Sequence, residues 1–133
     1  MRRIVLAAAA VVLLSGAAMA DDSDGIDCNN AMTQMAMNIC ADRDYQAADR
    51  RLNDTYRALM AMLDGDQRQK LIAAERAWIG FRDAHCRSET AESEGGSIHP
   101  MMYSSCLTDM TKARLKELQA SLACQRHGEK CYD

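Results

Sequence analysis

The sequence predicts an all-α fold, a small antiparallel bundle of about three helices that disulfides stabilise. Apolar side chains recur at steps of three and four, no stretch alternates as a strand does, and six cysteines follow an export signal. The single proline, and glycines near positions 65, 95 and 128, divide the chain into helical stretches near residues 33–63, 67–89 and 98–123.

Residues 1–20 are typical of a Sec-type signal peptide. Two arginines precede an apolar run, and the small residues after it end in Ala18-Met19-Ala20, which predicts cleavage after Ala20. Ala17 stands where a lipoprotein would have its cysteine. We therefore expect a periplasmic or secreted protein without a lipid anchor or membrane insertion, whose residues 21–133 form one helical domain with a short C-terminal disulfide tail.

The predicted mature chain is acidic. Removal of residues 1–20 takes away two arginines, which leaves 14 basic against 19 acidic side chains and a formal net charge of −5. Such a domain is expected to avoid nucleic acid and anionic lipid and to attract cationic partners at low salt.

The first helical stretch has one apolar face, and its length of about 31 residues makes a break near Asp42 an alternative. That face is formed by Tyr45, Ala48, Leu52, Tyr56, Leu59 and Leu63. Asp64 or Asp66 is expected to cap the second stretch, and the connection at 64–66 is so short that the first two helices should be antiparallel neighbours.

The second and third stretches repeat the same periodicity. The second carries Leu71, Glu75, Trp78, Arg82 and Cys86 on one face. The third carries Met102, Cys106, Met110, Leu115, Leu118 and Leu122, with one stutter. Pro100 suits a first helical turn, and Ser97 is the predicted cap upstream of it.

All six cysteines lie in the predicted mature chain, and export favours three disulfides. Cys86 and Cys106 lie ten residues before and after Gly96, so they should face each other across a helical hairpin. Cys28 can reach Cys40 if the lead-in folds back along the first helix. Cys124 with Cys131 then follows by elimination, although a crossed pair of Cys28 with Cys131 stays open.

Two segments carry a resemblance to a known family. Residues 32–41 read MTQMAMNICA, and residues 75–86 read ERAWIGFRDAHC, followed by Cys106, Thr111, Arg114 and Leu118. The second segment fits the W-I-x-F-R-D-x-x-C element of the LprI-like lysozyme inhibitor family, and the resemblance covers nearly all of residues 28–122. It implies a small helical, disulfide-bonded domain of the periplasm or the exterior, in a family named for a member that inhibits lysozyme.

The chain departs from that family's pattern in three places. Glu75 stands where glutamine is usual, the lipoprotein cysteine is absent, and Cys124 with Cys131 forms an additional tail.

Trp78, Arg82 and Asp83 are interpreted as structural. Trp78 and Arg82 are four residues apart on one helical face, so Arg82 can stack on an aromatic ring and pair with a carboxylate across the hairpin.

Metal and enzyme chemistry find little support in the sequence. The mature chain has eight methionines, of which Met32, Met35 and Met37 would be the best soft-metal cluster, but we expect methionine to fill the core. His85, His99 and His127 have no suitably spaced partner ligands, and Ser97 with His99 lacks the context of a nucleophile. We therefore predict no catalytic residue, no metal and no cofactor.

The linker at 88–97 is the predicted recognition site. Glu89, Glu92 and Glu94 would lie at the rim of a basic partner, while Ser97 or His99 would enter its cleft. A solvated acidic turn with no partner is the alternative reading.

The predicted function is that of an exported binding protein that inhibits lysozyme by occlusion. The predicted partner is lysozyme or another cationic envelope protein. A structural or adaptor module of the envelope that binds another protein is one alternative, and a methionine-rich periplasmic metal-binding protein is the other.

Overall fold

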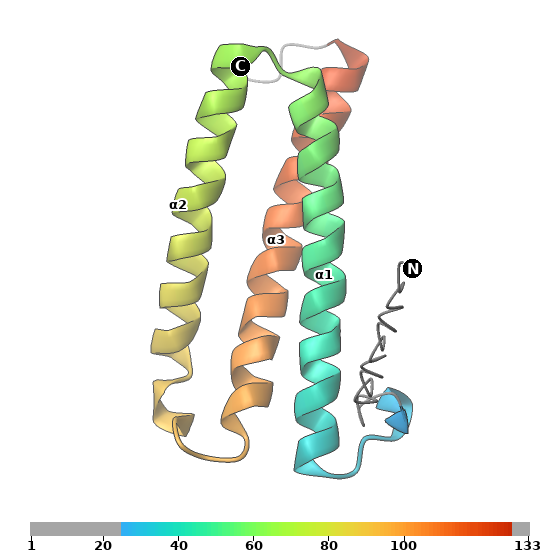
Figure 1. The fold of residues 1–133 in the computed structure, drawn as a ribbon, viewed down its shortest axis with the longest axis vertical. Coiled ribbons are helices and arrows are strands. Elements are labelled where there is room, and N and C mark those ends of the chain that lie inside the picture. The colour runs from blue at the N-terminus through green and yellow to red at the C-terminus, as the bar shows by residue number, and fades with distance from the viewer. Residues whose placement is uncertain (1–24, 129–133) are drawn as a thin grey trace, which may run out of the picture.

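The computed structural model describes residues 25–128 (Figure 1). A short 3-10 turn at Cys28–Asn30 leads into α1 (Gln34–Met62), α2 (Gly65–Glu89), a second 3-10 turn at Ala91–Ser93, and α3 (His99–His127). No strand occurs between residues 25 and 128. The predicted fold class is confirmed, and all three helices begin and end close to their predicted positions.

α1 is one continuous helix, so the alternative of a break near Asp42 is wrong. Thr33 caps its start by accepting a hydrogen bond from the Ala36 amide at 3.1 Å. The Asp42 carboxylate accepts from Gln46 one turn later, at 2.6 Å, which is compatible with an unbroken helix. Packing against α3 over much of its length stabilises a helix that is long for a globular protein.

The starts of α2 and α3 are built differently. Asp64 and Gln67 form a reciprocal capping box at the start of α2, which confirms one of the two predicted caps. The prediction that Ser97 caps α3 is wrong. Ile98 already has helical backbone angles at the cap position and gives no side-chain capping bond. Pro100 lies in the first turn, where the amide hydrogens have no partner within the helix. Proline has no amide hydrogen, so it leaves no donor unpaired at this position.

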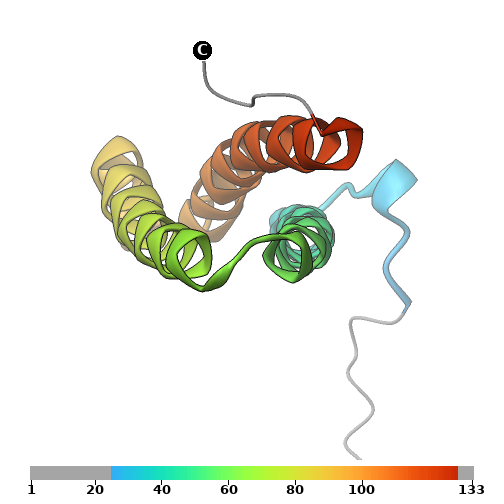
Figure 2. The same ribbon diagram turned by 90° about the horizontal axis from the view of Figure 1, so that it is seen from above.

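The three helices pack unevenly. α1 and α3 run parallel and make most of the contacts between helices, whereas α2 runs antiparallel to both and stands away from α1 (Figures 1 and 2). The buried core is a leucine cluster between α1 and α3, formed by Leu52, Leu59, Leu115, Leu118 and Leu122. No helix of residues 25–128 has the length and apolar character to cross a membrane.

The prediction that methionine fills the core is wrong. None of the eight methionines between residues 25 and 128 is buried, and Met32 and Met35 are 82% and 69% exposed. Leucines already fill the space between α1 and α3. Met32 lies just before the cap of α1 and Met35 in its first turn, at the end of the bundle.

α2 buries polar rather than aliphatic side chains. Its buried residues are Glu75, Arg82 and Cys86, at spacings that place all three on one helical face. Each is bonded to another helix, through the ion pair of Glu75 with Arg114, the pairing of Arg82 with Asp49, and the disulfide of Cys86. The apolar side chains of α2 are therefore only partly covered.

Two of the predicted disulfides are present. Cys28 is bonded to Cys40 and Cys86 to Cys106, each with a Cα–Cα distance of 5.6 Å. The bond of Cys28 to Cys40 rules out the crossed pairing of Cys28 with Cys131. Cys124 is disulfide-bonded. Its predicted partner Cys131 lies outside the described residues, as do residues 1–20, so the third pairing and the signal peptide remain predictions.

Candidate partner-binding site

The segment that joins α2 to α3 is acidic and exposed. Glu89, Glu92, Glu94 and Ser97 are all exposed, and no lysine or arginine occurs between residues 88 and 98. We call residues 89–98 the acidic turn. It lies at the end of the bundle opposite the connection between α1 and α2 (Figure 1). The residues predicted for the rim of a partner are therefore available to solvent.

Hydrogen bonds and a disulfide hold the acidic turn in place. The buried Thr90 donates its hydroxyl to the Cys86 carbonyl at 2.7 Å, and its amide donates to the same carbonyl at 3.1 Å. The Ser93 hydroxyl bonds to His99 Nδ1 at 2.9 Å. The bond of Cys86 to Cys106 closes the base of the hairpin. A turn ordered in this way loses less conformational entropy when it docks on a partner.

The two residues predicted to enter a partner's cleft are not equally available. Ser97 has an exposed side chain, and its carbonyl accepts a hydrogen bond from the Asn38 amide group at 2.9 Å, which ties the turn to α1. His99 is half-buried and stacks on Tyr103 with ring centroids 6.1 Å apart. Ser97 is the more accessible of the two.

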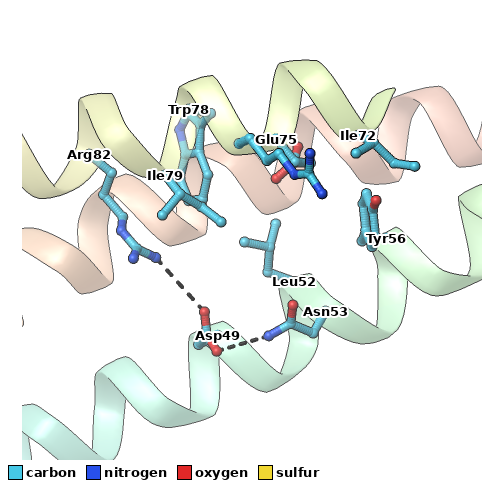
Figure 3. Close-up of a pocket in the computed structure, with 10 residues that line it drawn as sticks. Asp49, Leu52, Asn53, Tyr56, Ile72, Glu75, Trp78, Ile79 and Arg82 are labelled. Carbon is cyan, nitrogen blue, oxygen red and sulfur yellow. Dashed lines mark hydrogen bonds and ion pairs between the residues drawn. The ribbon is translucent and has the colours of Figure 1, made fainter. Parts of the chain in front are cut away.

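A second surface feature is a groove between α1 and α2, which we call the α1/α2 groove (Figure 3). Its volume is about 520 Å³. It is lined by Asp49, Leu52, Asn53 and Tyr56 of α1 and by Ile72, Glu75, Arg76, Trp78, Ile79 and Arg82 of α2. The sequence analysis missed it, because periodicity places several of these residues on inward faces without revealing that α2 stands away from α1.

Arg82 lies at one end of the groove, nearly buried at 7% exposure. Its guanidinium lies 5.2 Å from the centre of the Trp78 ring and 5.5 Å from that of Tyr45. It pairs with Asp83 at 2.8 Å and faces Asp49 at 3.8 Å. The geometry expected of Arg82, with stacking on an aromatic ring and a carboxylate on another helix, is present, and Tyr45 is an additional partner that sequence reasoning did not identify.

The pKa values of Tyr45 and Arg114 are both raised by their surroundings. Burial raises the pKa of Tyr45, and the carboxylates of Asp49 and Asp83 act in the same direction, while the Arg82 cation opposes them. Burial acts to lower the pKa of Arg114, but hydrogen bonds to Glu117 and Glu75 outweigh it and raise that pKa. In both places, charged groups connect α2 to its neighbours.

The histidines considered as metal ligands are dispersed. His85 stacks on Phe81 with ring centroids 5.6 Å apart, His99 is bonded within the acidic turn, and His127 ends α3. Among residues 25–128 no group of three or more His, Cys, Asp or Glu side chains is placed to hold a metal ion.

Comparison with known proteins identifies the family. The model of the family "Lysozyme inhibitor LprI" matches residues 27–118. An uncharacterized protein from Rhizobium meliloti (strain 1021) is 42% identical over 106 residues, which cover 70% of this chain and 76% of that protein. No solved structure matches the chain. The matched region spans all of α1 and α2, the acidic turn and most of α3, and we conclude that the chain belongs to the lysozyme inhibitor LprI family.

Proposed function

We propose that this protein inhibits lysozyme by binding to the enzyme and covering its cleft, without any chemical step of its own. One observation carries the proposal for this chain. Three exposed glutamates occupy a turn that lacks lysine and arginine, and a disulfide and internal hydrogen bonds hold that turn. Membership of the family supports the choice of lysozyme as the partner.

Electrostatics indicates how the acidic turn would be used. Lysozymes are commonly basic, so a turn with excess negative charge would steer the two proteins together and raise the association rate. The cleft itself contains two catalytic carboxylates, which would repel glutamates. Glu89, Glu92 and Glu94 therefore contact the basic rim, and the exposed, uncharged Ser97 lies over the cleft.

The predicted export signal is compatible with this activity, because lysozyme acts on the cell wall outside the cytoplasmic membrane. An inhibitor that shields the wall has to reach the periplasm or the exterior. Cleavage after Ala20 would deliver residues 21–133 there with the acidic turn intact.

The proposal is tested by measuring lysis of cell walls by hen egg-white lysozyme in the presence of residues 21–133. We expect inhibition that is stronger at low than at moderate salt, because salt screens the rim charges. A triple variant, Glu89→Gln, Glu92→Gln and Glu94→Gln, should weaken inhibition about tenfold or more, in the range of rim-charge effects on association.

A matched control removes three other exposed carboxylates, with Asp44→Asn, Asp54→Asn and Asp109→Asn. Both variants change the net charge equally, so inhibition close to that of the wild type in the control assigns the effect to the turn. Equal weakening by both variants would assign it to net charge alone. Absence of both binding and inhibition in the wild-type protein at either salt concentration would refute the proposed function.

A further inference from the structure

We infer that the α1/α2 groove is a second contact site for the same partner, and that it receives a lysine or arginine side chain together with its apolar stem. The inference rests on the proposed function for the identity of that partner. The inference adds a second contact surface, the α1/α2 groove, and a kind of contact that the acidic turn does not supply, the binding of an apolar stem together with its charged end.

The groove has an apolar floor that the fold leaves uncovered. α2 is fastened to its neighbours mainly by ion pairs and a disulfide, so no aliphatic side chain of α2 is fully buried. Ile79 is 44% exposed, and Ile72 and Trp78 are half-buried beside the buried Leu52 of α1. The labelled side chains converge on the space between the two helices (Figure 3). An aliphatic stem that enters this space would bury apolar surface on both sides.

Asp49 supplies the acceptor for a cation in the groove. One of its carboxylate oxygens accepts a hydrogen bond from the Asn53 amide group at 2.8 Å. The other lies 3.8 Å from Arg82, which is beyond hydrogen-bond distance. The side chain is 37% exposed and points toward the groove (Figure 3). Asp49 can therefore accept a charge-assisted hydrogen bond from an incoming donor.

The charges at this end of the groove favour a cation. Asp49 and Asp83 are two carboxylates placed around one arginine, Arg82, so a negative charge remains in excess. Further along the groove, Glu75 is compensated by Arg114, and Arg76 is an exposed cation of the lining. The negative excess is therefore confined to the end at Asp49. A lysine or arginine at Asp49 would balance the local charge, whereas a carboxylate would add repulsion.

A saccharide fits the groove less well, because the ring of Trp78, the largest aromatic side chain in the lining, already carries a guanidinium. The Arg82 guanidinium lies over the Trp78 ring, and Trp78 also packs against the leucine core. One face of the Trp78 ring is therefore not available to a stacking sugar ring. The observations therefore favour a protein side chain.

The groove and the acidic turn can contact one partner at the same time. Glu89 follows Arg82 by seven positions in α2, which corresponds to about 10 Å along a helix. An interface of ordinary size covers about 800 Å² on each partner and spans that distance easily.

The test measures the dissociation constant for hen egg-white lysozyme by isothermal titration calorimetry. Asp49→Asn and Ile79→Ser remove the acceptor and part of the apolar floor. Two matched controls alter the same helices outside the groove: Asp54→Asn on α1, and Phe81→Ser on α2, where Phe81 is 59% exposed. We expect binding to weaken tenfold or more in both groove variants and less than twofold in both controls. Urea unfolding of each variant checks that the fold is retained.

The outcomes separate this inference from the proposed function. If the wild-type protein binds lysozyme and both folded groove variants bind equally well, the groove inference is wrong and the proposed function stands. If the wild-type protein does not bind, both fail. Saturable binding of chitotriose that Ile79→Ser abolishes would identify the groove as a saccharide site and would also overturn the inference.

Discussion

At the scale of single residues, Arg82 connects more of the molecule than any neighbour on its helix. It lies against the rings of Trp78 and Tyr45 and reaches carboxylates on both α1 and α2, although it is almost fully buried. A planar guanidinium can stack on rings and form in-plane hydrogen bonds at once, which an ammonium group cannot do. Arginine therefore suits this position better than lysine.

We expect Arg82→Met to lower the free energy of unfolding by about 2 kcal/mol. Breaking a surface ion pair costs little, whereas breaking a buried ion pair typically costs about 3–5 kcal/mol. The expected loss lies between these values, because Asp49 and Asp83 are each about one-third exposed and water can solvate them in the variant. Methionine retains the apolar stem, so the loss reports on the charged group. Urea unfolding at neutral pH measures it.

Arg82→Lys is the matched control, since it keeps the charge and removes the planar group. Its loss of stability should fall between those of the wild type and Arg82→Met. If Arg82→Met unfolds at the same urea concentration as the wild type, the structural role assigned to Arg82 is wrong.

Glu75 is a second residue of α2 that forms an ion pair with another helix. Its carboxylate receives two bonds from Arg114, at 2.6 and 2.7 Å. Both side chains are largely buried. This carboxylate therefore gives α2 an ion pair to α3.

At the scale of elements, α2 is fixed at both ends as well as by the ion pairs of Glu75 and Arg82 in its middle. The capping box at Asp64 fixes its start, and Arg68 adds a bond to the Met60 carbonyl of α1 at 2.9 Å. The disulfide of Cys86 fixes the other end. Local changes at the start of α2 should therefore affect global stability.

Asp64→Ala is expected to lower the free energy of unfolding by about 1 kcal/mol, the usual cost of losing an N-cap side chain. The variant loses the bond from the Asp64 carboxylate to the Gln67 amide, which is 2.9 Å long. Thermal unfolding followed by circular dichroism at 222 nm measures the effect.

Ser97→Ala serves as the comparison, because Ser97 precedes α3 without capping it. Its stability should stay within about 0.5 kcal/mol of the wild type, as for ordinary surface substitutions. A loss as large as that of Asp64→Ala would show that Ser97 caps the helix after all.

At the scale of the whole molecule, the two disulfides that have both cysteines among residues 25–128 have separate tasks. Cys28 with Cys40 clips the lead-in onto α1, and Cys86 with Cys106 joins α2 to α3 directly beneath the acidic turn. Only the second of these bonds should matter for the presentation of the turn to a partner.

Removing the bond between α2 and α3 with Cys86→Ala and Cys106→Ala should cost about 3 kcal/mol of stability, because the unfolded chain gains the conformational entropy that a closed loop of this length had removed. Amide hydrogen exchange at residues 88–97 should also become faster, and lysozyme inhibition should weaken.

The control is Cys28→Ala with Cys40→Ala, which removes a bond distant from the turn in sequence. It should lower stability while changing exchange at residues 88–97 less than the loss of Cys86 and Cys106 does, because both the bond of Cys86 to Cys106 and the bond from Asn38 to the Ser97 carbonyl are retained. Unchanged exchange and inhibition after loss of Cys86 and Cys106 would show that the turn is ordered without the disulfide.

Much of this architecture followed from the sequence because the signals that determine it are local. Apolar periodicity, Pro100 and the Asp64 cap act within a few residues, and they located the three helices. The pairing of Cys86 with Cys106 followed from equal spacing about Gly96, since a helical hairpin brings such positions together. The acidic character of the turn needs no tertiary information either.

Only the tertiary structure decided how far apart the helices stand. Periodicity shows which face of a helix points inward, but the separation depends on side chains that meet from distant parts of the chain. Leucines of α1 and α3 pack closely, whereas α2 meets them through Glu75 and Arg82, so the groove beside Ile79 stays open. Because leucines occupy the space between α1 and α3, the methionines lie outside the core.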